Sequence, residues 1–268
     1  APLVKVKHSS PIDIPYQHNN IKVNTIPQIK LTSIGASIAS FFKLPYILFL
    51  IFKACKKTDH IHIRCPGNIG LLGCFVQAWF PKKPKTVKYA GNWDPKSKQP
   101  WSYQIQKWIL KNEFLTRNTQ VLVYGNWKEP SKNIHPFFTA SYKEEEKIDV
   151  EPKPLKDKIG LLFVGTLNSG KRPLLTLKVL KALVHLNYNV HLDIYGEGQQ
   201  RGTIEAYVSE NNLSNFVTLH GNKDKEALKK AYQKAHFLVF MSKSEGWPKV
   251  VAEAMFWKCL PISTNVSC

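Results

Sequence analysis

The sequence predicts an α/β fold that consists of two parallel β-sheets, each doubly wound with helices on both faces. In both halves of the 268-residue chain, apolar runs of strand length alternate with runs of helix length, and parallel strands require such helical crossovers. Between the halves, residues 143–158 are charged, contain two prolines and lack apolar periodicity, which is typical of a linker. We therefore predict a first domain at 1–142 and a second at 159–268.

The first half is expected to contain several short strands and one long apolar helix. Pro45 falls inside this helix and either kinks it or starts a second helix. The expected strands are 3–7, 21–26, 59–64, 86–90 and 120–124, and the expected helices are 31–57, 66–79 and 101–115.

The second half alternates more regularly. Its last helix is expected to start at Pro248, because the N–H that proline lacks would be unpaired in a first turn. The expected strands are 159–164, 190–195, 216–219, 237–241 and a last one that ends at 264, and the helices are 174–186, 200–211, 223–235 and 248–258.

The positive charge of the chain is concentrated in its first half. Residues 1–140 contain 20 basic and 5 acidic residues, net +15, whereas residues 141–268 contain 18 and 14, net +4. Such a field attracts nucleic acid, an anionic membrane surface or an acidic substrate. Because no zinc-finger, helix-turn-helix or RNA-binding signature accompanies it, we expect no nucleic-acid partner.

The longest apolar run, residues 44–52, lies between Lys43 and Lys53. It is far shorter than the ~20 residues of a spanning helix, so it is either a buried helix or one that lies on a membrane surface. The five cysteines form no even framework, which favours a reducing compartment. We therefore expect a cytoplasmic protein that can dock peripherally on the inner face of the membrane.

Four potential zinc ligands lie close together in the first half: Cys55, His60, His62 and Cys65. Structural zinc sites usually show paired short spacings, and no matching second cluster accompanies this one. We therefore expect neither a metal nor a cofactor.

The stretch from Phe237 to Thr264 is the most informative one. The first-turn amides of its helix, together with Gly246, form a site for an anion. Glu245 and Glu253 lie about 10 Å apart if they face one crevice, since a helical residue rises about 1.5 Å. Carboxylates bind vicinal hydroxyls, so one acid can hold a sugar and the other a ribose, with a diphosphate between them. Alternatively, both are ordinary acids near a helix N-terminus.

The string SEGWPKVVAEAM, followed by PIST, resembles the Glu-x7-Glu signature of the retaining glycosyltransferases of family 4. These are hexosyltransferase-like nucleotide-sugar enzymes of the GT-B fold, in which two Rossmann-like domains face a cleft. The resemblance implies that Glu245 contacts the transferred sugar and Glu253 the ribose hydroxyls. It also implies a glycan or lipid-linked acceptor and a role in cell-surface polysaccharide or lipopolysaccharide synthesis.

The loop GTLNSGKRP, which follows the strand at 159–164, resembles the loop that binds the donor diphosphate in this family. The family carries Arg after the glycine and Lys five residues later; here Lys171 matches, Thr166 replaces the Arg, and Arg172 can substitute for it. A solvent-exposed basic turn is the alternative. With Glu245 and Lys171 as the catalytic pair, the donor-binding candidates are Gly165, Thr166, Lys171, Arg172, Gly196, Gly246, Trp247, Pro248, Lys249 and Glu253.

Candidates on the acceptor side come from two strands of the first half, which end alike in AGNW (90–93) and YGNW (124–127). Tryptophan stacks on sugar rings and asparagine binds hydroxyls, so Asn92, Trp93 and Trp127 are candidates, with packing as the alternative role of both tryptophans. Arg64 either meets an acceptor phosphate or is a surface residue. Since Asn92 stands where the family commonly carries a His, the resemblance implies no catalytic His in this chain.

Relative to this family, the chain lacks the first strand of its first domain and stops before the second domain is complete, so we expect a fragment truncated at both ends. Lys258 stands where relatives favour glycine, and a left-handed Lys costs about 1 kcal/mol relative to Gly. Two other functions stay open. One is a nucleotide-sugar epimerase of the same fold, and the other is a non-catalytic binder of anionic glycans or nucleic acid.

Overall fold

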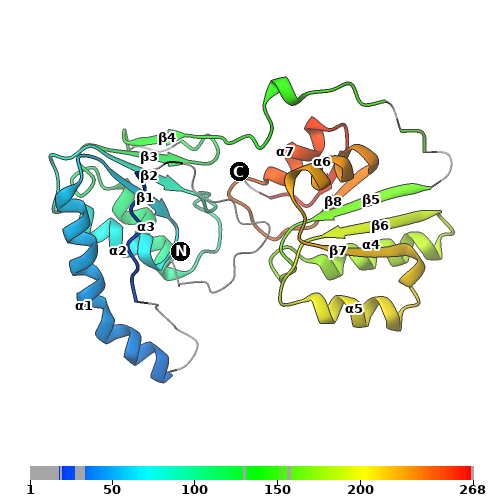
Figure 1. The fold of residues 1–268 in the computed structure, drawn as a ribbon, viewed down its shortest axis with the longest axis horizontal. Helices are drawn as coiled ribbons and strands as arrows, with labels where there is room; N and C mark the ends of the chain where they lie inside the picture. Colours follow the sequence, from blue (N-terminus) through cyan, green and yellow to red (C-terminus); the bar gives the residue numbers. More distant parts are fainter. Residues whose placement is uncertain are drawn as a thin grey trace. The chain divides into compact units, whose positions relative to one another are not determined.

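The computed structural model of the chain describes residues 18, 20–27, 34–128, 131–151, 153–155 and 158–266, without the side chains of 34–39. The chain divides into two compact units, with the boundary between Phe138 and Thr139 rather than after residue 142. Figure 1 traces both units.

The first unit is built on a four-stranded sheet in the order β1-β2-β3-β4, in which all neighbouring strands are parallel. Its elements are α1 (Ile34–Lys57), β1 (Ile61–Cys65), α2 (Asn68–Gln77), β2 (Lys85–Tyr89), α3 (Trp101–Lys111), β3 (Thr119–Val123) and β4 (Ile134–Pro136). The three-residue β4 was not predicted. The predicted strand at 21–26 is wrong, because these residues form no strand, and the one at 3–7 lies outside the described residues.

The buried residues of this sheet gather on one of its faces. Ile61, Ile63, Val87 and Val121 pack there with the inner sides of α2 and α3. The side chains between them point to the other face and include the exposed Arg64. In the part of the chain that the structure describes, helices therefore cover this sheet on one face.

The second unit contains a five-stranded parallel sheet in the order β7-β6-β5-β8-β9. Its elements are η1 (Glu144–Glu146), β5 (Ile159–Val164), α4 (Pro173–His185), β6 (Val190–Tyr195), α5 (Arg201–Glu210), η2 (Ser214–Phe216), β7 (Val217–Gly221), α6 (Lys225–Lys234), β8 (Phe237–Phe240), α7 (Lys249–Phe256) and β9 (Leu260–Ser263). The strands at 159–164 and 190–195 have the predicted bounds, and the other predicted elements agree within a few residues.

Helices cover both faces of this second sheet (Figure 1). Leu161 and Phe163 of β5 face a core shared with α4 and α5, whereas Leu162 and Val164 face a second core shared with α6 and α7. The doubly wound arrangement follows from this alternation, because both sets of side chains of a central strand are buried.

The predicted linker at 143–158 instead packs against the second unit. Lys153 Nζ donates to the carbonyls of Tyr232 (3.2 Å), Ala235 (2.6 Å) and Lys258 (3.1 Å). Lys258 Nζ in turn lies 2.5 Å from a carboxylate oxygen of Asp149. Charged side chains of this segment, which suggested a solvated linker, therefore contact the second unit.

Lys258 adopts the left-handed conformation, with φ of 52°. This position follows α7, where a glycine would be favoured, so the expected conformation is confirmed.

Candidate donor-binding site

The second sheet has a topological switch point between β5 and β8. From β5 the chain moves outward to β6 and β7, and it then returns to the other side of β5 to form β8 and β9. In doubly wound sheets, ligands bind at the carboxyl ends of the strands beside such a point. The loops at 165–172 and 241–248 follow β5 and β8, so both predicted donor loops leave the sheet at this place.

Asn168 shapes the first of these loops. Its Oδ1 accepts hydrogen bonds from the backbone N–H groups of Gly170 and Lys171, each at 3.0 Å. Its carbonyl accepts a bond of 3.2 Å from the N–H of Arg172. Asparagine commonly closes turns in this way. The Asn-Ser-Gly run was the available signal for this residue, which sequence reasoning did not single out.

The two predicted catalytic residues are in direct contact. Lys171 Nζ lies 2.5 Å from Glu245 Oε1, and the buried Ser242 hydroxyl donates to the same oxygen. The backbone joins the two loops as well, since the N–H of Lys243 donates to the carbonyl of Gly170 at 2.9 Å. The site thus holds a paired lysine and carboxylate at the mouth of the sheet.

Gly196 supports this loop through the backbone. It has φ of 139°, and a Cβ atom at this position would lie 1.9 Å from the carbonyl oxygen of Gly165. Only glycine allows the end of β6 to approach the β5 loop so closely. The structure therefore gives Gly196 a role in shaping the loop, and its contact with the donor stays a prediction.

The remaining candidates of the β5 loop differ in setting. Thr166 is exposed, and Arg172 is half-buried. Arg172 directly precedes α4 and has φ of 53°. No contact in the structure joins the Arg172 side chain to the pair of Lys171 and Glu245, so its substitution for the missing family Arg stays a prediction.

The helix α7 begins at Lys249, one residue later than expected, and Pro248 is the residue before it. The Trp247 indole N–H donates to the carbonyl of Thr139 at 2.8 Å. Gly246 is half-buried, and Lys249 is exposed. Lys249 and Glu253 line a small cavity of about 110 Å³, which residues 139–142 also line.

Glu253 lies in a hydrogen-bond network of its own. Its Oε1 accepts a bond of 2.5 Å from the Ser141 hydroxyl, and its Oε2 accepts one of 2.9 Å from the Tyr232 phenol. Burial, followed by the charge of Glu253, raises the pKa of Tyr232, so the phenol keeps its proton and donates. The contacts do not place Glu245 in this network, so the two acids form separate clusters.

The four candidates of the first unit lie in different settings. Trp93 is fully buried and packs edge-on against Tyr89 with ring centroids 4.8 Å apart, so its proposed stacking on a sugar is wrong. Asn92 is buried too, and its Oδ1 accepts from the N–H of Asp94. Trp127 packs against the core and donates to the carbonyl of Tyr124 at 2.7 Å. Arg64 is exposed and lines a cavity of about 460 Å³.

The suggested zinc ligands do not converge. His60 and His62 each bond to the Thr86 hydroxyl, at 3.0 and 2.8 Å, whereas Cys65 lies beside Cys74 with 3.6 Å between sulfurs. Within the described ranges, no group of three or more His, Cys, Asp or Glu side chains is arranged to hold a metal ion.

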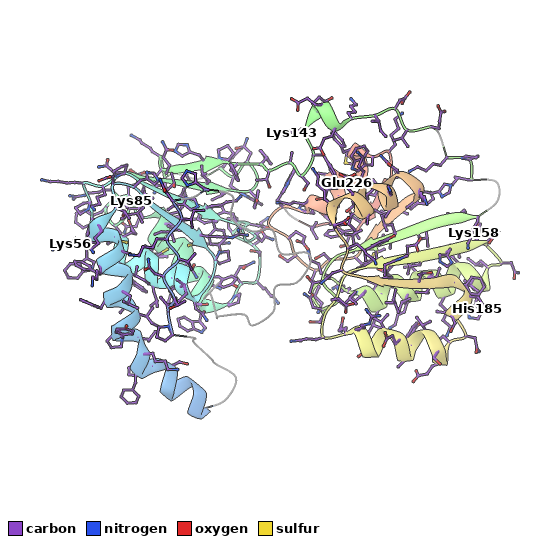
Figure 2. All side chains as sticks on the ribbon, viewed as in Figure 1. Lys56, Lys85, Lys143, Lys158, His185 and Glu226 are labelled. Atoms are coloured by element: carbon purple, nitrogen blue, oxygen red, sulfur yellow. The ribbon has the colours of Figure 1, made fainter. Side chains whose placement is uncertain are left out.

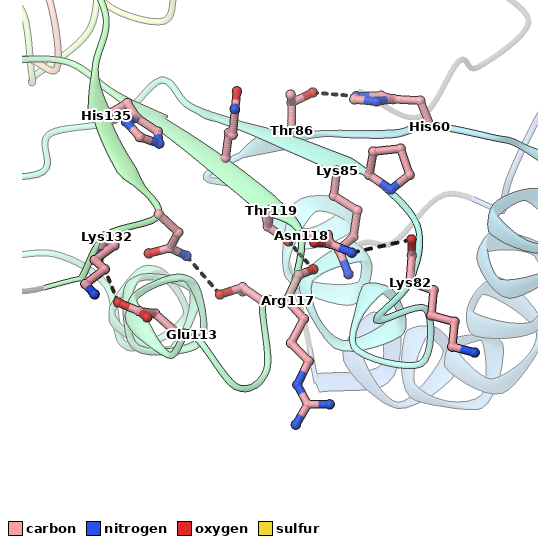
Figure 3. A pocket seen from close by; sticks show the side chains of 14 residues that line it. His60, Lys82, Lys85, Thr86, Glu113, Arg117, Asn118, Thr119, Lys132 and His135 are labelled. Atoms are coloured by element: carbon pink, nitrogen blue, oxygen red, sulfur yellow. Dashed lines mark hydrogen bonds between the residues drawn. The ribbon is translucent and has the colours of Figure 1, made fainter.

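A cavity of about 670 Å³ in the first unit is a poor candidate for the main ligand site (Figure 3). Lys85 and Thr119, which line it, begin β2 and β3, so it lies at the amino ends of these strands. Ligands of parallel sheets bind at the opposite ends. In Figure 3 the side chains of Lys82 and Arg117 also extend in different directions, which does not form one focused anion site.

Comparisons with known proteins relate the second unit to a family of glycosyl transferases. Residues 143–268 match the family described as "Glycosyl transferases group 1". The chain is 32% identical over 252 residues to the GalNAc-alpha-(1->4)-GalNAc-alpha-(1->3)-diNAcBac-PP-undecaprenol alpha-1,4-N-acetyl-D-galactosaminyltransferase of Campylobacter jejuni, a match that covers 92% of this chain and 66% of that relative.

A second relative of the same organism is the N-acetylgalactosamine-N,N'-diacetylbacillosaminyl-diphospho-undecaprenol 4-alpha-N-acetylgalactosaminyltransferase. It is 32% identical over 253 residues, which cover 85% of this chain and 64% of the relative. The chain therefore spans about two thirds of the length of these curated relatives.

Among solved structures, HepE of Anabaena in complex with UDP and glucose matches with a TM-score of 0.62 at 10% identity. The match covers 83% of this chain and 63% of that structure. At this identity the likeness concerns the fold alone. The chain therefore has the α/β fold with two parallel sheets of the GT-B glycosyltransferases, and its residues 143–268 match the glycosyl transferases group 1 family.

Proposed function

We propose that the chain is part of a retaining glycosyltransferase of family 4, which transfers a sugar from a nucleotide-diphosphate sugar to a lipid-linked or glycan acceptor. The observation that carries this proposal is the contact between Lys171 and Glu245 at the switch point of a group 1 domain. Both residues occupy the positions at which the family signature requires a lysine and an acid.

In the proposed donor complex, positive charge at the switch point holds the diphosphate. Lys171 and the positive end of the α7 helix dipole supply this charge, so no metal is needed. Glu245 then orients the transferred sugar, and Glu253 binds the ribose hydroxyls. The leaving phosphate takes the proton of the acceptor on the same face of the sugar, so no protein nucleophile takes part.

The proposed acceptor is an oligosaccharide on a lipid diphosphate. The names of both Campylobacter jejuni relatives state undecaprenol-linked diphosphate acceptors. The excess of basic residues in the first half favours such an anionic acceptor electrostatically. We accordingly propose a cytoplasmic enzyme that works at the membrane face in cell-surface polysaccharide or lipopolysaccharide synthesis.

Calorimetric titration with UDP and with GDP tests the donor site, and UDP is the first ligand to use because HepE was solved with it. We expect saturable UDP binding that Glu253→Ala abolishes and that the control Glu210→Ala, an exposed acid on α5, leaves unchanged. Absence of binding to either nucleotide by a folded protein would overturn the proposal.

A second experiment separates transfer from other chemistry on the same donor. With a UDP-sugar, donor consumption should require an acceptor and should continue in EDTA. Consumption without an acceptor would indicate an epimerase or a hydrolase instead.

A further inference from the structure

The helix α1 is apolar on two opposite sides. Ile47 is fully buried, and Leu48, Ile51 and Cys55 pack against the core of the first unit. A surface helix normally has a polar outer face. On α1, the outer face instead exposes large side chains, with relative exposures of 67% for Phe41, 75% for Phe42, 56% for Tyr46 and 58% for Phe49.

These outer side chains form one stripe with lysines. Phe42, Tyr46, Phe49, Lys53 and Lys56 follow each other at intervals of four, three, four and three residues, so they lie along one line of the helix surface. We call these five residues the α1 stripe. From Phe42 to Lys56 it is about 21 Å long, since each residue rises about 1.5 Å. Its first half is aromatic, and its second half is basic.

The charge around the stripe has one sign. All the charged residues of α1 are lysines, and its last turn carries Lys56 and Lys57. The side chains of Lys43, Lys53, Lys56 and Lys57 are all exposed, and Figure 2 marks Lys56 near the end of the helix. Exposed aromatic rings beside lysines complement a surface that has an apolar interior and anionic groups on its outside.

Lys83 and Phe80 of the first unit hold α1 in place. Lys83 Nζ donates to three carbonyls at its C-terminal end, those of Cys55 (2.8 Å), Lys56 (2.9 Å) and Thr58 (2.5 Å). The ring of Phe52 packs against Phe80 with centroids 5.1 Å apart. These contacts involve no side chain of the stripe, whose three aromatic rings stay exposed.

We propose that the α1 stripe docks the protein on an anionic lipid bilayer. Phe42, Tyr46 and Phe49 enter the interface between headgroups and acyl chains, while Lys53 and Lys56 contact anionic headgroups. No helix of the described ranges is long and apolar enough to cross a membrane. The lipid-linked acceptor of the proposed function would share this bilayer, but the docking itself needs neither donor nor acceptor.

Flotation with vesicles tests this inference. We expect binding to vesicles of equimolar phosphatidylcholine and phosphatidylglycerol and much weaker binding to phosphatidylcholine alone. The Lys53→Gln, Lys56→Gln double variant should bind the anionic vesicles roughly thirtyfold more weakly, since each lysine near such a surface contributes about 1 kcal/mol. The Phe42→Ser, Phe49→Ser double variant should lose at least about tenfold.

Two control variants match these changes. Trp79→Ser with Trp108→Ser removes rings that are 77% and 62% exposed but lie outside α1, and Lys178→Gln with Lys230→Gln removes exposed charges of the second unit. Both should bind vesicles within about twofold of the unchanged protein. Equal losses in the controls and the stripe variants would overturn the inference.

The remaining outcomes are also decisive. UDP titration of the stripe variants should match the unchanged protein. If the protein binds UDP but not the anionic vesicles, the inference fails while the proposed function stands. If the protein binds the anionic vesicles but not UDP, the inference stands while the proposed function fails. Self-association that Phe42→Ser abolishes, without vesicle binding, would show that a second copy covers the stripe and would likewise overturn the inference.

Discussion

The phenol of Tyr232 donates a hydrogen bond of 2.9 Å to Oε2 of Glu253, the acid that we propose to bind the ribose. Tyr232 is fully buried on α6, so it fixes this carboxylate from the protein side. Ser141, which lines the small cavity together with Glu253, occupies the other oxygen. The two partners therefore have opposite expected effects on the binding of a nucleotide.

Tyr232→Phe should weaken UDP binding. Hydrogen bonds to charged groups contribute about 1.5–3 kcal/mol, and without the phenol the carboxylate loses a fixed orientation, so we expect Kd to rise roughly tenfold. Calorimetric titration measures this effect. Tyr207→Phe, on α5, should leave Kd unchanged, and an equal effect of both variants would contradict the positioning role of Tyr232.

Ser141→Ala should strengthen UDP binding. The Ser141 hydroxyl donates to the Glu253 oxygen that a ribose hydroxyl would use, so it has to be displaced in the complex. Removing this competitor should lower Kd about three- to tenfold, because the bond that is broken on binding is charge-assisted. Weaker binding by this variant would mean that Ser141 supports the ribose instead.

Gly196→Ala should destabilise the second unit by about 3 kcal/mol. The new Cβ atom would meet the carbonyl oxygen of Gly165 at 1.9 Å, so one of the two backbones has to move. Urea denaturation measures the loss. The control Gly202→Ala lies in α5 with open space around its Cβ position, and it should stabilise by about 0.5–1 kcal/mol.

Lys153→Met should lower the free energy of unfolding by about 1–3 kcal/mol, since three carbonyls lose their shared donor. Urea denaturation followed by circular dichroism provides the measurement. Lys178→Met, at an exposed position of α4, should change the free energy by less than about 0.5 kcal/mol. A similar small effect at Lys153 would show that the segment at 143–158 is held by other contacts.

His62 should make the protein less stable in mild acid. Burial, and then the positive charges of His60, Lys88 and Arg64, lower its pKa from the usual 6.5. Between that lowered pKa and 6.5, the unfolded chain binds more protons than the folded protein, so the free energy of unfolding falls as the pH drops through this range. His62→Gln should reduce this pH dependence in urea denaturation at pH 7.5 and 5.5. An unchanged slope would contradict the lowered pKa.

The sequence predicted much of the second unit because each local signal there agrees with the fold. The strands at 159–164 and 190–195 are short apolar runs that end at glycine, and the structure has them at the same bounds. Lys171 and Glu245, the predicted catalytic pair from two different loops, are in contact. Their loops follow neighbouring parallel strands, so the pairing is consistent with the predicted sheet.

Other features depend on contacts that no local pattern encodes. Ser141 reaches Glu253 across 112 residues of sequence, and Tyr232 looked like an ordinary helix residue. Trp93 follows a strand as a ligand-binding aromatic would, but its ring turns into the core. The charged segment at 143–158 resembles a solvated linker until its partners on the second unit are known.

The lysines of the chain differ in how accessible their amines are to a reagent. Lys83, Lys85 and Lys153 direct their ammonium groups to backbone carbonyls, whereas many other lysines lie in solvent. An amine-selective acylating reagent should therefore modify these three last. Their rates of modification, read by mass spectrometry, would report the local opening of each unit separately and without any substitution, because Lys83 and Lys85 belong to the first unit and Lys153 to the second.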